Sequence, residues 1–225
     1  MRIVAVADTH LFHDELTVPD GDIFVHAGDM CRSGELEELA AAAQWISSLP
    51  HRHKVIVAGN HDWAFVQAPE EARALLGGEV VYLQDSAATI EGVRFWGSPW
   101  QPEYNDWAWN LPRGSALAAR WALIPDGVDV LVTHGPPAGI GDRYCADGFI
   151  GHDRSGCEDL RARVLQVVPR LHLFGHIHQD GGLWQQGRTT FANVTTWECE
   201  RAPTVIDFDP LTGDVHPVVV PPARR

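Results

Sequence analysis

The sequence predicts a mixed α/β fold in which sheets lie between layers of helices. Six short apolar runs rich in Val and Ile recur along the chain, and helical segments separate some of them. Near-continuous β-branched runs of this length are typical of strands buried on both faces. Strands that alternate with helices and carry added hairpins indicate an α/β sandwich. The predicted strands span residues 2–7, 23–27, 54–58, 79–83, 128–133 and 171–174.

Three helices are predicted between these strands. The first spans residues 33–49, with Ser33 as its N-cap, acidic residues in its first turn and Pro50 as its stop. The second spans residues 69–78 and ends in glycines, and the third spans residues 157–168.

Hairpins extend the predicted sheets. Glu91-Gly92 separates "ATI" from "VRFWG", and Gln186-Gly187 separates "GLWQ" from "RTTFANV". The C-terminal stretch predicts two more strands around "DPLTGD". Because no repeat or linker-like stretch interrupts the chain, residues 1–225 are expected to form a single domain.

Composition limits the class of protein. With 225 residues, 45% hydrophobic and 21% charged, the chain can bury a core. A formal net charge of −13 argues against a long nucleic-acid partner. No apolar stretch approaches the roughly 20 residues of a membrane span, and the N-terminus lacks a signal-peptide core. We therefore expect a cytoplasmic protein with free thiols and no membrane partner, and the sequence leaves monomer and dimer both open.

Polar side chains follow five of the predicted strands at the point where each strand ends. Sites in α/β sheets lie beyond the carboxyl ends of the strands. Alternate residues of an extended chain share a face, so His176 and His178 in "GHIH" are expected to face the same edge. Five strands thus bring seven groups together: Asp8, His10, Asp29, Asn60, His134, His176 and His178.

These residue types predict a metal centre. Imidazole nitrogens and carboxylate oxygens are ligands for Mn, Fe, Zn, Co or Ni. Seven groups are too many for one tetrahedral zinc ion, but they suffice for two ions that share a carboxylate. A single DxH or HxH motif would be weak evidence; five in order are strong. We expect two divalent transition-metal ions, with Mn favoured because no thiolate belongs to the set.

The order of these motifs, DxH, GD, GNHD, H and GHxH, resembles the calcineurin-like metallophosphoesterase superfamily. The stretches "PDGDIFVHAGD", "FWGSPWQPEYNDWAWN", "DVLVTHGPP" and "LHLFGHIHQDGG" resemble its metallophosphoesterase-domain-containing branch, which is similar to class III cyclic-nucleotide phosphodiesterases. The resemblance implies a four-layer α-β-β-α sandwich of two mixed sheets, with a dinuclear metal site at the C-terminal edge of the strands.

The resemblance also implies a role for each site residue. Asp29 bridges the two metals, Asn60 and His61 meet the substrate, and His61 acts on the leaving group without binding metal. One metal is held by Asp8, His10 and His178, and the other by Asn60, His134 and His176. Many superfamily members have a second Asp three residues after the bridging one. Arg32 stands there in this chain, which weakens a protein-phosphatase reading, and Asp62 is expected to orient the loop.

The expected reaction is hydrolysis of a phosphodiester, for example a cyclic nucleotide, by a metal-bound hydroxide. His61 would donate a proton to the leaving oxygen. One alternative is a phosphomonoesterase that acts on nucleotides or sugar phosphates, and another is a nucleotide-binding regulator with low turnover. The complete donor set argues against the regulator. A metallo-β-lactamase-like hydrolase needs HxHxDH, which is absent from the sequence. The expected partner is a small phosphate ester.

Aromatic residues crowd the loop of residues 98–110, which prolines flank. Aromatic faces stack on bases, so Trp107 or Trp109 is predicted to cover the organic part of the substrate, for example a nucleobase. Packing of these rings onto the domain or onto a second subunit is the alternative. Among the other histidines, His26 and His172 are expected to pack inside strands and His51 to be solvated. Secondary candidates for the pocket are His13, His152 and Arg154.

Overall fold

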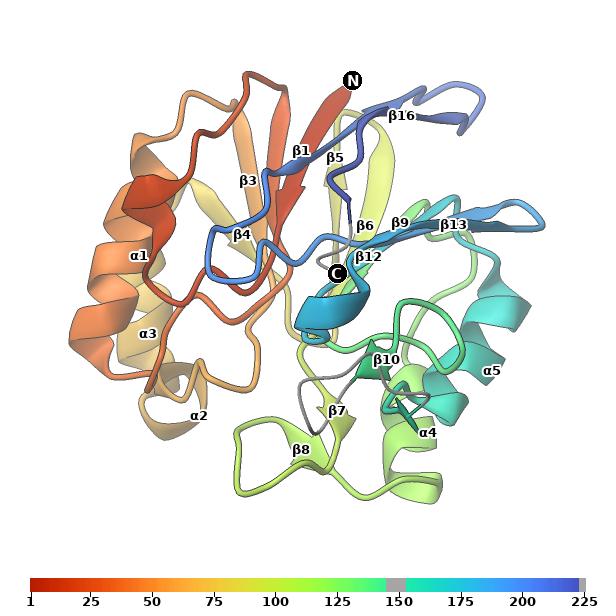
Figure 1. Cartoon of the computed structure of the whole chain (residues 1–225), viewed down its shortest axis with the longest axis horizontal. Coiled ribbons are helices and arrows are strands. Elements are labelled where there is room, and N and C mark those ends of the chain that lie inside the picture. The colour runs from red at the N-terminus through yellow and green to blue at the C-terminus, as the bar shows by residue number, and fades with distance from the viewer. Residues whose placement is uncertain (145–152, 223–225) are drawn as a thin grey trace.

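Two six-stranded sheets face each other in the computed structural model, which describes residues 1–144 and 153–222 (Figure 1). The first sheet has the strand order β16 (Val215–Val219), β15 (Thr204–Phe208), β1 (Arg2–Val6), β2 (Ile23–His26), β3 (His53–Ile56) and β4 (Val80–Tyr82). The second has the order β13 (Gly182–Gln186), β14 (Thr189–Asn193), β12 (Leu171–Phe174), β9 (Val130–Thr133), β6 (Val93–Ser98) and β5 (Ser86–Ile90). Both sheets are mixed, because β15, β16, β13 and β5 run antiparallel to their neighbours and the remaining pairs are parallel.

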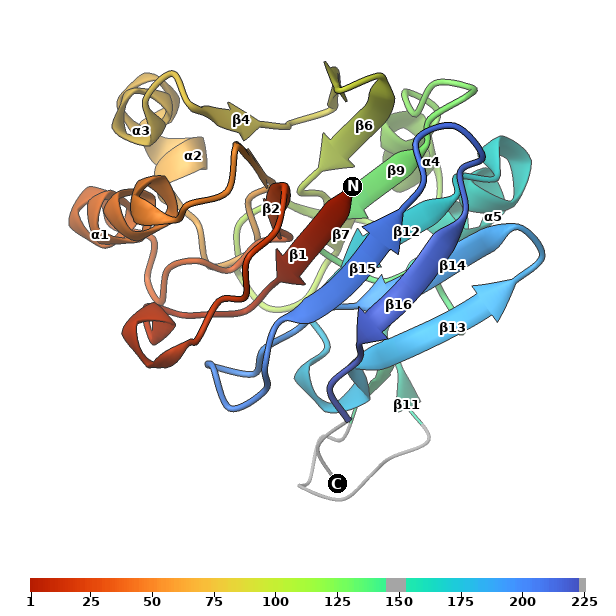
Figure 2. The same ribbon diagram turned by 90° about the horizontal axis from the view of Figure 1, so that it is seen from above.

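Helices cover the outer faces of both sheets, as Figure 2 shows from above. The first sheet is covered by α1 (Leu36–Ser48), α2 (Ala64–Gln67) and α3 (Pro69–Leu76), and the second by α4 (Ser115–Trp121) and α5 (Glu158–Val167). The predicted four-layer α-β-β-α sandwich is therefore confirmed. The short elements are η1 (His13–Glu15), η2 (His178–Asp180), the pair β7 (Gln101–Pro102) and β8 (Asn110–Leu111), and the pair β10 (Arg143–Tyr144) and β11 (Asp153–Arg154).

The central strands are buried on both faces. In β1, Ile3 and Ala5 face the second sheet, whereas Val4 and Val6 face α1 and α3, and all four are 0% exposed. An isolated bridge between Ala7 and Thr195 then joins the end of β1 to the chain beyond β14. The two sheets thus meet at the edge where the polar residues emerge.

The predicted strands and hairpins are all present, with shifts of one or two residues at their ends. The predicted N-cap at Ser33 is wrong, because α1 begins only at Leu36. The carboxylate of Glu38 accepts the backbone N–H groups of Arg32, Ser33 and Gly34 at 3.1, 2.8 and 2.8 Å. These residues therefore form a turn around Glu38 and not the first turn of the helix.

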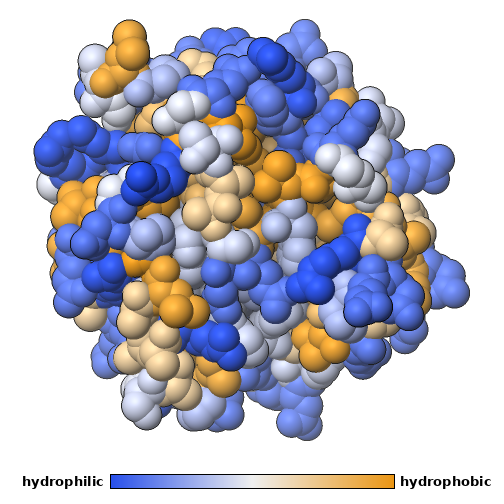
Figure 3. All heavy atoms as spheres, turned by 180° about the vertical axis from the view of Figure 1, so that it is seen from behind, coloured by the Kyte–Doolittle hydropathy of each residue, from blue (hydrophilic) through white to orange (hydrophobic). Residues whose placement is uncertain are grey.

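One face of the molecule is seen in a space-filling view from behind (Figure 3). The rear face in Figure 3 carries mainly polar side chains, with hydrophobic ones gathered near its centre. Among the described residues, Leu211 is the most exposed large hydrophobic residue, at 95%. Truncating it should change stability little. No helix in residues 1–144 or 153–222 is both long enough and apolar enough to cross a membrane.

Histidines are packed inside the strands, as expected for His26 and His172. His172 in β12 is 0% exposed, and its Nε2 lies 2.8 Å from Oγ1 of Thr133 in β9. Burial lowers the pKa of His172 to about 3. The expectation that His51 is solvated is wrong: it is 1% exposed and packs against Phe24.

The loops that follow β2 and β3 are tied together by Asp62, which is fully buried. Its carboxylate accepts the N–H groups of Asp29, Cys31 and Gly59 at 3.0, 2.9 and 2.7 Å. Burial, together with the nearby charge of Asp29, raises the pKa of Asp62 to about 6. The expected role of Asp62 in orienting the loop is consistent with these bonds.

We expect His172→Gln to reduce the loss of stability on acidification. Because the folded pKa of His172 lies below the ordinary 6.5, only the unfolded chain takes up the proton as the pH falls from 6.5 toward 3. This histidine should therefore cost about 2 kcal/mol of stability between pH 7 and pH 5. Urea unfolding at both pH values measures the effect, and Leu211→Ala is the control. An unchanged pH dependence in the Gln variant would contradict a neutral buried His172.

Asp62→Ala should lower the free energy of unfolding by on the order of 3 kcal/mol, because buried N–H groups would lose their acceptor. Urea denaturation at pH 7 measures this change. The matched surface control, Asp126→Ala, removes a carboxylate that is 90% exposed and should stay within about 0.5 kcal/mol of the wild type. An equally small effect at Asp62 would show that the two loops do not depend on it.

Candidate metal centre

The seven groups singled out in the sequence converge at one end of the two sheets. Three come from the ends of β1 and β2, one from the end of β3, and three from the ends of β9 and β12. Potential ligand atoms lie within 4.8 Å of one another in three sets: Asp8, His10 and His178; His10, Asp29 and His61; and Asp29, His134 and His176. Asp29 and His10 each belong to two of the sets, so these two residues link the three sets into one cluster.

Asp29 contacts groups from both sheets. Its Oδ2 lies 3.3 Å from Nε2 of His134 and 3.8 Å from Nε2 of His10. Its Oδ1 accepts the backbone N–H of His61 at 2.8 Å. Asn60 joins the cluster through its Oδ1, which lies 2.9 Å from Nε2 of His134. One carboxylate thus connects the two halves of the site.

Asp8 forms the second buried carboxylate. Its Oδ1 lies 3.6 Å from Nε2 of His178. The backbone N–H of His176 donates to both of its oxygens at 3.1 Å. The "GHIH" segment after β12 is therefore fixed to the end of β1.

Backbone carbonyls orient two of the site histidines. Nδ1 of His10 lies 3.0 Å from the carbonyl oxygen of Cys31, and Nδ1 of His134 lies 2.9 Å from that of Ala27. A carbonyl oxygen only accepts hydrogen bonds, so Nδ1 carries the hydrogen in both rings. Nε2 is then the nitrogen that faces the carboxylates, which is the usual arrangement of a histidine ligand.

The electrostatics of the cluster favour added positive charge. Burial would raise the pKa of Asp29, but His134 beside it lowers that pKa well below its ordinary value. Burial would lower the pKa of His134, but Asp29 raises it to about 9. Asp8 and His178 behave in the same way. Their mutual attraction outweighs burial, so the pKa of Asp8 is lowered and the pKa of His178 is raised. Two buried carboxylates therefore draw positive charge into the site, and divalent cations would supply it.

Four of the seven residues have a left-handed backbone, with φ of 58° at Asp8, 42° at His10, 59° at Asp29 and 68° at His176. This conformation is uncommon for residues with a Cβ atom and costs of order 1–3 kcal/mol. Such strain clusters at functional sites, where the surrounding structure enforces it. The strong packing of both sheets supplies that enforcement here.

Two glycines allow the carboxylates to approach the backbone closely. A Cβ atom on Gly59 would lie 2.2 Å from Oδ1 of Asp29, and one on Gly175 would lie 2.7 Å from Oδ2 of Asp8. Both distances are far below van der Waals contact. Residues larger than glycine at these positions would push the carboxylates out of place.

His61 lies at the rim of this cluster and is half-buried. Its Nδ1 lies 2.5 Å from the carbonyl oxygen of Arg32. Its ring meets the edge of His10 at 4.7 Å and lies 4.0 Å from the ring of Trp107. His61 is therefore held by neighbours on three sides.

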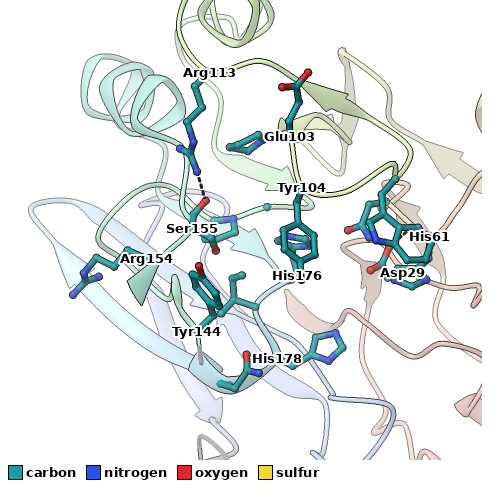
Figure 4. A pocket seen from close by; sticks show the side chains of 17 residues that line it. Asp29, His61, Glu103, Tyr104, Arg113, Tyr144, Arg154, Ser155, His176 and His178 are labelled. Carbon is teal, nitrogen blue, oxygen red and sulfur yellow. Dashed lines mark hydrogen bonds between the residues drawn. The ribbon is translucent and has the colours of Figure 1, made fainter. Parts of the chain in front are cut away.

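A cavity of about 630 Å³ opens beside the cluster. Figure 4 shows His61 and Asp29 on one side of it, with Arg113, Tyr144 and Ser155 on the other. The pocket residues not identified from the sequence include Pro102, Glu103, Tyr104, Arg113, Tyr144, Ser155 and Gln179. Pro102, Glu103 and Tyr104 lie in the aromatic loop and Gln179 follows His178 directly, so these residues lie next to sequence signals, whereas Arg113 and Tyr144 do not.

The remaining candidates divide between the pocket and the core. Trp107 and Arg154 line the pocket. Trp109 does not: it is 6% exposed, packs edge-on against Trp100 at 5.2 Å and belongs to the core beneath α1 and α3. The prediction that Trp109 covers the substrate is wrong, because burial of its indole anchors the loop. His13 is also buried, stacked on Trp45, and His152 lies outside the described residues.

Comparisons with known proteins agree with this geometry. Residues 1–202 match the description "Calcineurin-like phosphoesterase superfamily domain". Metallophosphoesterase domain-containing protein 1 of Homo sapiens is 39% identical, and the match covers 92% of this chain and 71% of that protein. The same values hold for Metallophosphoesterase domain-containing protein 1 of Mus musculus.

Solved structures share the fold at low sequence identity. The protein TT1561 of Thermus thermophilus has a TM-score of 0.63 at 15% identity, covering 96% of this chain and 97% of that one. Phosphopantetheinyl hydrolase (PptH) from Mycobacterium tuberculosis has a TM-score of 0.56 at 15% identity, covering 96% and 95%. The family match, the curated relatives and the clustered His and Asp residues agree, and the chain belongs to the calcineurin-like phosphoesterase superfamily.

Proposed function

We propose that this protein is a dinuclear metal-dependent phosphoesterase that hydrolyses small phosphodiesters. The observation that carries the proposal is the position of Asp29, whose Oδ2 lies 3.8 Å from Nε2 of His10 and 3.3 Å from Nε2 of His134. One ion would be held by Asp8, His10 and His178, and the other by Asn60, His134 and His176, with Asp29 serving both.

The donor chemistry fits transition-metal ions. The set contains imidazoles, carboxylates and one amide oxygen, and no thiolate, which suits Mn, Fe, Zn, Co or Ni, with Mn favoured. The two carboxylates are almost fully buried, at 0% and 2% exposure. Without added cations they would need protonated histidines to balance them. Bound ions supply Lewis acidity and lower the pKa of coordinated water.

His61 is proposed to serve the leaving group. The carbonyl of Arg32 holds the Nδ1–H of the ring, so Nε2 is the nitrogen left for the substrate. When Nε2 is protonated, it donates its proton to the departing oxygen. Asn60 precedes His61 in the loop and lines the same pocket, where its amide also contacts the substrate.

The pocket suits a phosphate ester with an organic group. Its volume, about 630 Å³, lies within the usual range for small-molecule sites. Arg113 bonds to the carbonyl oxygens of Gly156 and Ser155, so its positive charge remains available to an anion. Tyr104 is 56% exposed in the wall, where its ring can meet an organic substituent. These features support a phosphate ester with a sizeable organic group, such as a cyclic nucleotide.

Active protein should contain two metal ions per chain, measured by inductively coupled plasma mass spectrometry. EDTA should abolish hydrolysis of bis-p-nitrophenyl phosphate, and Mn²⁺ should restore it best. Asp29→Ala should lose metal and turnover together because both ions depend on this carboxylate, whereas Asp126→Ala should keep both. A fully active preparation with at most one ion per chain would end the dinuclear proposal. Comparison with p-nitrophenyl phosphate separates diester from monoester preference.

His61→Ala should keep both metal ions and lower kcat by roughly 10²–10⁴-fold for cyclic AMP, since the leaving alkoxide needs a proton. The defect should shrink for bis-p-nitrophenyl phosphate, whose leaving group needs none. His216→Ala, a change at an exposed histidine in β16, is the matched control. Loss of metal from the His61 variant would instead make His61 a ligand, which its place beside His10 and Asp29 allows.

A further inference from the structure

The imidazole of His61 is hydrogen-bonded to a main-chain oxygen, faces an indole and meets the edge of the His10 ring. Its Nδ1 lies 2.5 Å from the carbonyl oxygen of Arg32. The ring of Trp107 lies 4.0 Å from it with an interplanar angle of 31°, so the indole covers one face of the imidazole. A single hydrogen bond at Nδ1 would still allow the imidazole ring to rotate about that bond. The indole of Trp107, packed against one face of the ring, blocks this rotation.

The side chain of Arg32 contacts groups other than the imidazole of His61. Its Nε donates to the carbonyl oxygen of His10 at 3.0 Å, and its guanidinium carbon lies 4.1 Å above the ring of Phe12. Only the carbonyl of Arg32 therefore serves His61. A neutral carbonyl binds a ring N–H less strongly than a carboxylate does, so the second restraint gains importance.

Trp107 is itself held in place by the backbone around it. The N–H of Ala108 donates to the carbonyl oxygen of Asn60 at 3.1 Å, which ties the loop to the residue before His61. On the other side, the N–H of Gln101 donates to the carbonyl oxygen of Trp109, whose indole is buried in the core. Trp107 thus occupies a fixed position against His61, and this contact already uses one face of its indole.

We propose that Trp107 is a positioning residue for His61, which keeps Nε2 of the imidazole directed at the leaving group. This inference rests on the proposed function, in which His61 donates the proton. A positioning role and direct stacking of Trp107 on the substrate would affect different kinetic constants. Loss of positioning lowers kcat for any poor leaving group, whereas loss of stacking raises KM for substrates with a base.

The test compares Trp107→Ala and Trp107→Phe with the wild type on three substrates. Diphenyl phosphate has a poorer leaving group and no base, cyclic AMP has a base, and bis-p-nitrophenyl phosphate needs no proton donor. We expect Trp107→Ala to lower kcat about 3- to 10-fold for diphenyl phosphate and cyclic AMP, and to change KM for both by less than about 2-fold. The third substrate should be nearly unaffected, and Trp107→Phe should restore most of the loss.

Two further measurements separate this role from the others. In a His61→Ala background, Trp107→Ala should have no further effect, because the ring that it positions is absent. In ¹⁵N spectra of the protein loaded with diamagnetic Zn²⁺, Trp107→Ala should shift or broaden the imidazole signals of His61, which are identified from their loss in His61→Ala. The signals of His134 should stay unchanged. The metal content should not change.

Several results would overturn the proposal. A KM increase confined to cyclic AMP, with unchanged His61 signals, would assign Trp107 to substrate stacking. Additive effects in the double variant, or loss of metal from Trp107→Ala, would mark a general structural role. If the wild type hydrolyses none of the substrates, the proposed function fails, and unchanged imidazole spectra would then also refute the positioning of His61.

Discussion

The site depends on burying the Asp29 carboxylate where the two sheets meet. A buried charge is unfavourable unless neighbouring groups balance it. The imidazoles of His134 and His10 and the N–H of His61 do so, from 3.3, 3.8 and 2.8 Å. These groups come from the ends of strands in both sheets. The two sheets must therefore be correctly aligned before the carboxylate of Asp29 has all of these partners.

Packing provides the rigidity that the cluster requires. Asp8, Asp29 and His176 are held in left-handed backbone conformations that their side chains disfavour. The strands before them are almost completely buried, between the sheets on one face and under helices on the other. Asp62 adds a local restraint, because it binds the N–H groups of Asp29 and Gly59 at once. The packing of the whole core thus offsets the unfavourable conformational energy of these left-handed residues.

Much of the fold and the centre of the site could be predicted from the sequence, since both follow from local patterns. Buried strands have short apolar runs, and the polar residues that follow parallel strands must meet at one edge. On the far wall of the pocket, Arg154 was a candidate from the sequence, but Arg113 and Tyr144 could not be predicted, because they reach it only through long-range packing. Trp109 was misplaced for a related reason: composition does not reveal which ring of an aromatic loop anchors it in the core. The prediction of Ser33 as the N-cap was wrong because the carboxylate of Glu38, which lies inside the helix, accepts the N–H groups of Ser33 and Gly34.

Each residue of the "GNHD" loop, residues 59–62, makes a different contact in the site. Gly59 lets Asp29 approach, Asn60 contacts His134, and Asp62 turns inward to hold the backbone. The carboxylate of Asp62 is therefore occupied with backbone groups, and Nδ1 of His61 bonds to a main-chain oxygen instead. A carbonyl accepts a hydrogen bond but cannot take up the proton, so in the proposed mechanism proton transfer by His61 would be confined to Nε2. At position 32 only a main-chain oxygen meets Nδ1 of His61, so the proposed reaction would have a single route for the proton, toward the pocket.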